Sequence, residues 1–158
     1  MKKTVLALAI ICILVPTLAV ADESDIVTGK WLTQDNDSHV LIYQEKEKYR
    51  GKIIWLKDPL FEKGHKLEGE PATDEHNPDP KLQDRAILGL EFVYDFVYDK
   101  NAKKWVNGKI YNPKDGNLYY CYMELKENGD LFLRGSIDPW GFVGKTAVWA
   151  RVTANVKE

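Results

Sequence analysis

The segment GKIYNPKDGNLY, residues 108–119, predicts two short β-strands joined by a tight turn. Asn112 is a residue type that favours the first position of a β-turn, and Pro113 fixes φ at the value that the second position needs. Gly116 can adopt the left-handed conformation that ends such a turn. A chain built around a hairpin of this kind is expected to contain further antiparallel strands.

The same pattern covers most of the chain, because short aromatic and β-branched runs alternate with Gly, Asn and Pro. No stretch shows the sustained apolar stripe of an amphipathic helix. We therefore predict about eight strands, over residues 29–33, 40–44, 49–56, 87–98, 104–111, 118–126, 131–137 and 143–152. In the third strand, alternation predicts one shared face for Tyr49, Gly51, Ile53 and Trp55.

Eight hairpin-linked strands are the number at which an up-and-down sheet can close on itself and lose its exposed edges. We predict an all-β fold, an antiparallel up-and-down barrel of about eight strands, with a two-layer sandwich as the alternative. Residues 57–86, rich in Pro and charge, are predicted to be one long irregular loop, either disordered or laid across an opening of the barrel. Residues 22–27 and the tail after Thr153 are expected to be loose.

The N-terminus predicts a secretory signal peptide over residues 1–21, with a membrane anchor as the alternative. Two lysines precede a short apolar run, and Ala19-Val20-Ala21 fits the small-x-small cleavage pattern. Pro16 interrupts the run, which is short for a span. We expect a single barrel domain over residues 22–158, periplasmic or secreted and without a membrane span after cleavage.

Residues 1–21 hold two of the 22 basic residues and none of the 24 acidic ones, which leaves the remaining chain with a net charge of −4. A mildly acidic domain of this kind is not expected to bind nucleic acid. One cysteine, Cys121, remains after cleavage. It is predicted to be a buried small apolar side chain, and a reactive thiol is the alternative.

Two features resemble the calycin superfamily of lipocalin-like barrels. Gly29-Lys30-Trp31 starts the first predicted strand, as the lipocalin Gly-x-Trp does, and Arg151 lies near the end of the last strand. The resemblance implies a guanidinium stacked on the Trp31 indole, worth about 0.5–2 kcal/mol. It implies structural roles for Gly29, Trp31, Trp149 and Arg151.

The chain after residue 21 is more specifically similar to DUF2147, a family of secreted bacterial proteins of unknown function. The most specific match is residues 108–116, GKIYNPKDG. The other matching residues are Gly29-Lys30-Trp31, residues 51–55, Asn77-Pro78-Asp79, Arg85, Gly89, Trp105, Tyr119, Leu131, Arg134-Gly135, residues 144–146, Trp149 and Arg151. The resemblance implies a calycin-like barrel in the cell envelope and does not imply a reaction.

Aromatic residues of the strands are the candidate ligand contacts, since a small barrel either fills its interior with side chains or encloses one ligand. Tyr offers an apolar ring with a polar tip, which suits an amphiphile. The predicted ligand-binding residues are Trp55, Trp105, Tyr111, Tyr119, Tyr122, Arg85, Asn77 and Asp79. A role in the core alone is the alternative for the aromatic ones.

The loop around Asp74, His76, Asn77 and Asp79 gathers oxygen ligands, but no spacing matches a defined metal site. An Asx-type turn network is the favoured interpretation. Arg85 is predicted to pair with Asp79 or Asp84, as a loop tether or as an anion clamp.

We therefore predict a binding protein for a small apolar or amphiphilic molecule, with no metal or cofactor implied. The first alternative is an envelope interaction module with a solid barrel. The second is a metal-assisted enzyme centred on residues 74–79, although the chain shows no catalytic motif.

Overall fold

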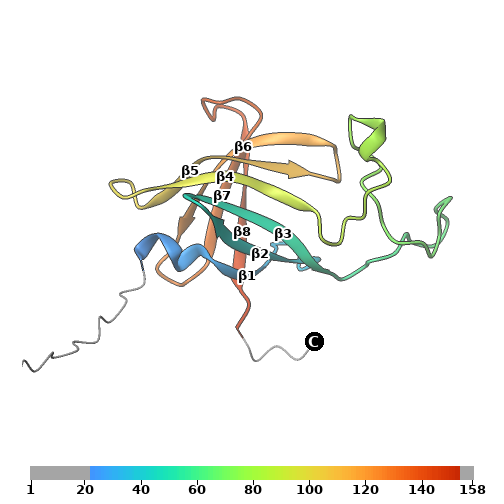
Figure 1. Cartoon of the computed structure of the whole chain (residues 1–158), viewed down its shortest axis with the longest axis horizontal. Helices are drawn as coiled ribbons and strands as arrows, with labels where there is room; N and C mark the ends of the chain where they lie inside the picture. Colours follow the sequence, from blue (N-terminus) through green and yellow to red (C-terminus); the bar gives the residue numbers. More distant parts are fainter. Residues whose placement is uncertain (1–21, 154–158) are drawn as a thin grey trace, which may run out of the picture.

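The computed structural model describes residues 22–153, which form a closed antiparallel barrel (Figure 1). The strands are β1 (Gly29–Leu32), β2 (Ser38–Glu45), β3 (Lys48–Leu56), β4 (Glu91–Asp99), β5 (Lys104–Asn112), β6 (Asn117–Leu125), β7 (Leu131–Ser136) and β8 (Gly144–Arg151). Each strand pairs with the next one along the chain, and β8 pairs with β1. The predicted all-β, eight-stranded up-and-down barrel is confirmed.

Two predictions lie outside the described residues: the signal peptide over residues 1–21 and the tail beyond Thr153. Within residues 22–153, no helix is both long enough and apolar enough to cross a membrane.

The β5–β6 turn has the geometry that its residue types predict. The Gly116 N–H donates to the Asn112 carbonyl at 2.8 Å, and Gly116 has φ +70°. A Cβ built on Gly116 would lie only 2.0 Å from the His76 carbonyl oxygen. Glycine is therefore required here for its conformation and for the close packing of this turn on the β3–β4 connection.

A short 3-10 helix, η1 (Glu23–Val27), closes one end of the barrel. Two of its backbone carbonyls accept hydrogen bonds from buried indoles. Trp31 Nε1 donates to the Val27 carbonyl at 2.8 Å, and Trp105 Nε1 donates to the Ser24 carbonyl at 3.0 Å. The Val27 side chain is fully buried. The expectation of a loose segment here is wrong, since these indole donors and the apolar contact hold the helix in place.

The seam between β1 and β8 is short, with two paired positions in the described chain. Arg151 reinforces it: the guanidinium lies 4.2 Å from the centre of the Trp31 ring, as the lipocalin resemblance implies. Its Nη1 donates to the Thr28 carbonyl at 3.0 Å, and Nη2 donates to the Ile26 carbonyl. A Cβ on Gly29 would lie 3.2 Å from Nη1, so glycine leaves room for the guanidinium.

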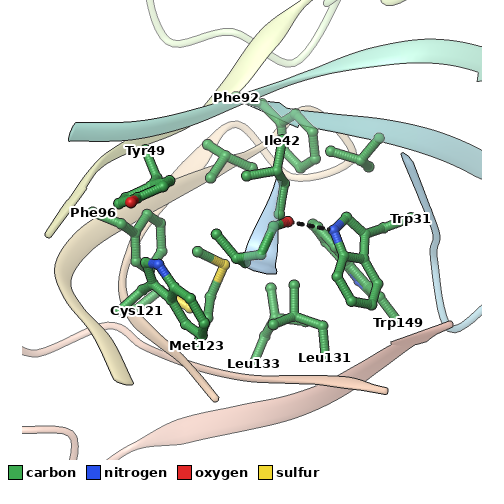
Figure 2. Close-up of a cluster of buried hydrophobic side chains, with 14 of the residues drawn as sticks. Trp31, Ile42, Tyr49, Phe92, Phe96, Cys121, Met123, Leu131, Leu133 and Trp149 are labelled. Atoms are coloured by element: carbon green, nitrogen blue, oxygen red, sulfur yellow. Dashed lines mark hydrogen bonds between the residues drawn. The ribbon is translucent and has the colours of Figure 1, made fainter. Parts of the chain in front are cut away.

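Buried apolar side chains form one cluster inside the barrel (Figure 2). Toward the end that η1 closes, they are at most 1% exposed: Trp31, Val40, Ile42, Tyr49, Phe96, Trp105, Met123 and Leu131. Toward the other end the inward side chains are 3–7% exposed: Ile53, Phe92, Tyr111, Cys121, Leu133 and Trp149. The prediction that Cys121 is buried is confirmed, and its thiol is free.

The prediction that Trp55 shares the inward face of β3 is wrong because β3 contains a bulge. Val40 pairs with Ile53 but His39 pairs with Trp55, so Ile54 is an extra residue in the ladder. An extra residue reverses the alternation beyond it. Trp55 therefore points outward, 39% exposed, with its ring 4.5 Å from that of His39.

We expect Arg151→Lys to lower the free energy of unfolding by about 1 kcal/mol, because an ammonium cannot both stack flat on Trp31 and reach two carbonyls. Urea denaturation, monitored by Trp fluorescence, measures the change in the free energy of unfolding. Lys100→Ala, at the β4–β5 turn, is the control and should change stability by less than about 0.5 kcal/mol. Equal stability of Arg151→Lys and the wild type would show that the seam does not depend on the guanidinium.

Candidate functional site

A cavity of about 1160 Å³ lies at the end of the barrel opposite η1. Its floor consists of apolar side chains from several strands, among them Ile53, Phe92, Cys121, Leu133 and Trp149. Its rim is formed by the β1–β2, β3–β4 and β5–β6 connections and the start of β8. These connections converge because an up-and-down barrel places alternate loops at the same end.

The β3–β4 connection, residues 57–90, is ordered and contains the 3-10 helix η2 (Pro80–Leu82). Two isolated bridges fold it back on itself, Leu60↔Pro71 and Thr73↔Ala86. Residues 58–62 line the cavity together with Thr73, Glu75, His76 and Ile87, while other parts of the loop extend away from the barrel (Figure 1). The loop therefore forms a wall of the cavity.

A buried carboxylate, Asp74, ties this loop to the barrel. Its Oδ1 accepts a hydrogen bond from the Tyr111 hydroxyl of β5 at 2.7 Å. Its Oδ2 accepts from Arg85 Nε and Nη2 at 2.8 and 2.7 Å and from Asn77 Nδ2 at 2.7 Å. Asp74 is fully buried, and the Arg85 guanidinium lies 5.4 Å from the centre of the Tyr111 ring. These contacts explain why an acid can be buried here, since its charge is paired and its oxygens are hydrogen-bonded.

The partner predicted for Arg85 is corrected by this network. Arg85 pairs with Asp74, not with Asp79 or Asp84, because the Thr73↔Ala86 bridge brings Asp74 beside Arg85. The tether interpretation of Arg85 agrees with this geometry.

Three effects raise the pKa of Tyr111 to about 12: burial has the largest effect, and the hydrogen bond to Asp74 and the charge of Asp74 add to it. The phenol therefore stays protonated and acts as a donor at neutral pH.

Protein donors surround the Asp74 carboxylate. Oδ2 accepts from three N–H groups, and Oδ1 accepts from the Tyr111 hydroxyl. Asn77 Oδ1 accepts from the Asp79 N–H at 2.9 Å, and Asp79 caps η2 by accepting from the Lys81 N–H at 3.0 Å. Between residues 22 and 153, no three His, Cys, Asp or Glu side chains are grouped to hold a metal. The observed contacts are those of the Asx-type network.

Of the predicted ligand contacts, Tyr111 and Tyr119 line the cavity. The others lie elsewhere. Trp105 is buried at the closed end against η1, and Asn77 and Arg85 belong to the Asp74 network. Asp79 is exposed at η2.

The outward position of Tyr122 follows from the alternation of β6, in which Cys121 and Met123 point inward. The Tyr122 ring instead contacts Phe132, with ring centres 6.3 Å apart, and lies 5.0 Å from Lys104 Nζ.

An ion pair on the rim joins two residues that the sequence does not link. Lys114 Nζ in the β5–β6 turn donates to Asp37 Oδ2 in the β1–β2 connection at 2.7 Å. These two connections are separated by β3 and β4 in one direction and by β7 and β8 in the other, so the pair crosses the opening. No sequence pattern marks the pair, because the contact depends on the closure of the barrel.

The ion pair shifts both pKa values. The hydrogen bond to Asp37 raises the pKa of Lys114. Burial by itself raises the pKa of Asp37, but hydrogen bonds from Lys114, Thr33 and Ser38 outweigh it, so this pKa lies below its usual value. Both groups are charged at neutral pH.

We expect Asp74→Asn to lower the free energy of unfolding by about 2–3 kcal/mol, because the partly buried Arg85 loses its counterion and an amide N–H faces other donors. Residues 57–90 should also become faster to cleave in limited proteolysis. The matched control is Asp84→Asn, an exposed acid next to Arg85, with an expected change below about 0.5 kcal/mol. Similar losses for both variants would contradict the tether.

Comparison with known proteins agrees with this geometry. The family model described as "Uncharacterized protein conserved in bacteria (DUF2147)" matches residues 29–151. A search of the curated proteins found no significant match. Among solved structures, the chain is similar to protein HP1028 from the human pathogen Helicobacter pylori, described as belonging to the lipocalin family. The identity is 30%, the TM-score is 0.66, and the match covers 81% of this chain and 84% of that one. The chain therefore belongs to the DUF2147 family of bacterial proteins and has a lipocalin-like barrel.

Proposed function

We propose that this protein binds one small amphiphilic or apolar molecule in the cavity at the open end of the barrel. The observation that carries the proposal is an apolar floor beneath a polar rim. The volume of about 1160 Å³ is slightly larger than the roughly 300–1,000 Å³ of typical small-molecule pockets. Similarity to a lipocalin-family structure supports the same class of function.

The floor favours an apolar group at the bottom of the cavity. Two polar groups next to this surface are already engaged, since the Tyr111 hydroxyl donates to Asp74 and Cys121 Sγ donates to the Tyr122 carbonyl at 3.4 Å. Burial raises the pKa of Cys121 to about 12, so the thiol is neutral. Each methylene buried against such a surface contributes about 0.8 kcal/mol. An alkyl chain or ring system is therefore the expected deep group.

The rim favours a polar group at the opening. Carboxylates and lysines occur together there, including Asp37, Lys114 and Asp115, and the Tyr119 hydroxyl donates to Asp115 at 2.7 Å. A head group at this level keeps contact with water while its tail is buried.

The proposal includes a location outside the cytoplasm, which rests on the signal-peptide pattern of residues 1–21. We expect native mass spectrometry of protein released gently from the cell envelope to give a chain that begins at Asp22 and carries one small molecule per chain. A chain found only in the cytoplasm and starting at Met1 would contradict the location. A mass spectrum that shows only the ligand-free chain would count against the proposal that the protein carries a bound small molecule.

Binding in the cavity is tested by a neighbouring pair of residues on β8. Ala147 lines the cavity, whereas Val148 does not line it and is 41% exposed. We expect Ala147→Phe to weaken binding of the neutral fluorophore N-phenyl-1-naphthylamine by about tenfold or more, because the new ring fills space that the probe needs. Val148→Phe is the matched control and should bind like the wild type. Equal titrations for both variants would place the probe outside the barrel.

A further inference from the structure

The β7–β8 connection, residues 137–143, has an unusual surface. Phe142 is 83% exposed, Trp140 79%, Ile137 62% and Val143 61%, the highest values among large apolar side chains of residues 22–153. Figure 1 shows this connection as a narrow loop that extends beyond the strands. We call residues 137–143 the apolar tip. Apolar side chains gathered in this way usually mark a contact surface.

The backbone of the apolar tip satisfies its own donors. The Asp138 carboxylate accepts from the N–H groups of Trp140, Phe142 and Val143 at 3.0, 3.2 and 3.0 Å. The Gly141 N–H donates to the Asp138 carbonyl at 3.2 Å. These hydrogen bonds lower the pKa of Asp138, and the one from the Val143 N–H has the largest effect. Because these N–H groups are already paired, they lose no hydrogen bonds to water when the loop contacts another surface.

Three cationic side chains lie near the apolar tip. Arg134 Nη2 donates to the Gly141 carbonyl at 3.0 Å, and Lys145 follows the tip on β8. Lys109 lies over the Tyr120 ring, which is on the strand next to the base of the tip. The acid within the tip, Asp138, faces its own backbone.

The carboxylates at the neighbouring β1–β2 connection, Asp35 and Asp37, face Lys114. Cations beside an exposed Trp and Phe therefore complement an anionic, partly apolar surface.

We propose that the apolar tip docks on a lipid bilayer that contains anionic lipids, with Trp140 and Phe142 at the boundary between head groups and acyl chains. A narrow projecting loop suits insertion between lipids, and indole rings favour this depth. Lys145 belongs both to the flank of the tip and to the cavity rim, so docking brings the opening beside the membrane surface. The docked orientation gives an amphiphile a short route between bilayer and cavity.

The test uses the chain beginning at Asp22, which contains the whole closed barrel, and vesicles of phosphatidylcholine with phosphatidylglycerol. We expect the wild type to float with the vesicles, more weakly at high salt, and brominated lipid to quench its Trp fluorescence. The partition coefficient of Trp140→Ser/Phe142→Ser should fall by about tenfold or more, because this variant loses two large apolar groups. Trp55→Ser/Leu118→Ser removes exposed apolar groups elsewhere and is the matched control.

The same experiment separates docking from ligand binding. Ala147→Phe should dock like the wild type even where it no longer binds the fluorophore, so failure of one proposal leaves the other intact. Thermal unfolding of the tip variant should match the wild type, since both side chains are exposed. Undiminished vesicle binding by the tip variant overturns the proposal. Absence of vesicle binding by the wild type, including the case in which the tip binds only a protein, overturns it as well.

Discussion

The closure of β1 onto β8 is the contact on which the rest of this structure depends. An eight-stranded sheet that failed to close would expose two edges and would bring no loops together. The seam itself is short, and much of its reinforcement comes from outside the ladder. The Arg151 guanidinium stacks on Trp31 and binds carbonyls at the end of η1, so one side chain joins the first strand, the last strand and the end plug.

The two ends of the closed barrel differ in what fills them. At the closed end, η1 supplies Val27 and the carbonyls that accept hydrogen bonds from Trp31 and Trp105, so these large aromatic rings are buried there with their N–H groups paired. No comparable plug from the described residues enters the other end, because the long β3–β4 connection is held at the wall by Asp74. A cavity thus remains where the barrel is open, and the rim ion pair of Lys114 and Asp37 crosses it.

The apolar tip and the cavity lie at the same end of the barrel for a topological reason. The strands run up and down, so the connections after β1, β3, β5 and β7 all emerge on one side. The proposed ligand cavity and the proposed membrane contact therefore lie on the same rim, although they use different side chains. The closed end is instead filled by its packed aromatic core.

Local residue types predicted the strands well, because alternation and turn chemistry act over a few residues. The turn at Asn112 and Gly116 has the expected conformation. The inward or outward position of a side chain was predictable only where the ladder is regular. Trp55 was misplaced because a bulge at Ile54 reverses the alternation, and a bulge leaves no clear mark in a single sequence.

By itself, the sequence determined the strand order, the turn positions, the burial of Cys121 and, through a family resemblance, the meeting of Trp31 and Arg151. Tertiary structure alone decided which groups share a site. Asp74 meets Tyr111 and Lys114 meets Asp37 across long stretches of chain, since barrel closure sets which loops face each other. Such contacts have no local pattern, because their energy comes from burial and charge pairing that exist only after the chain has closed.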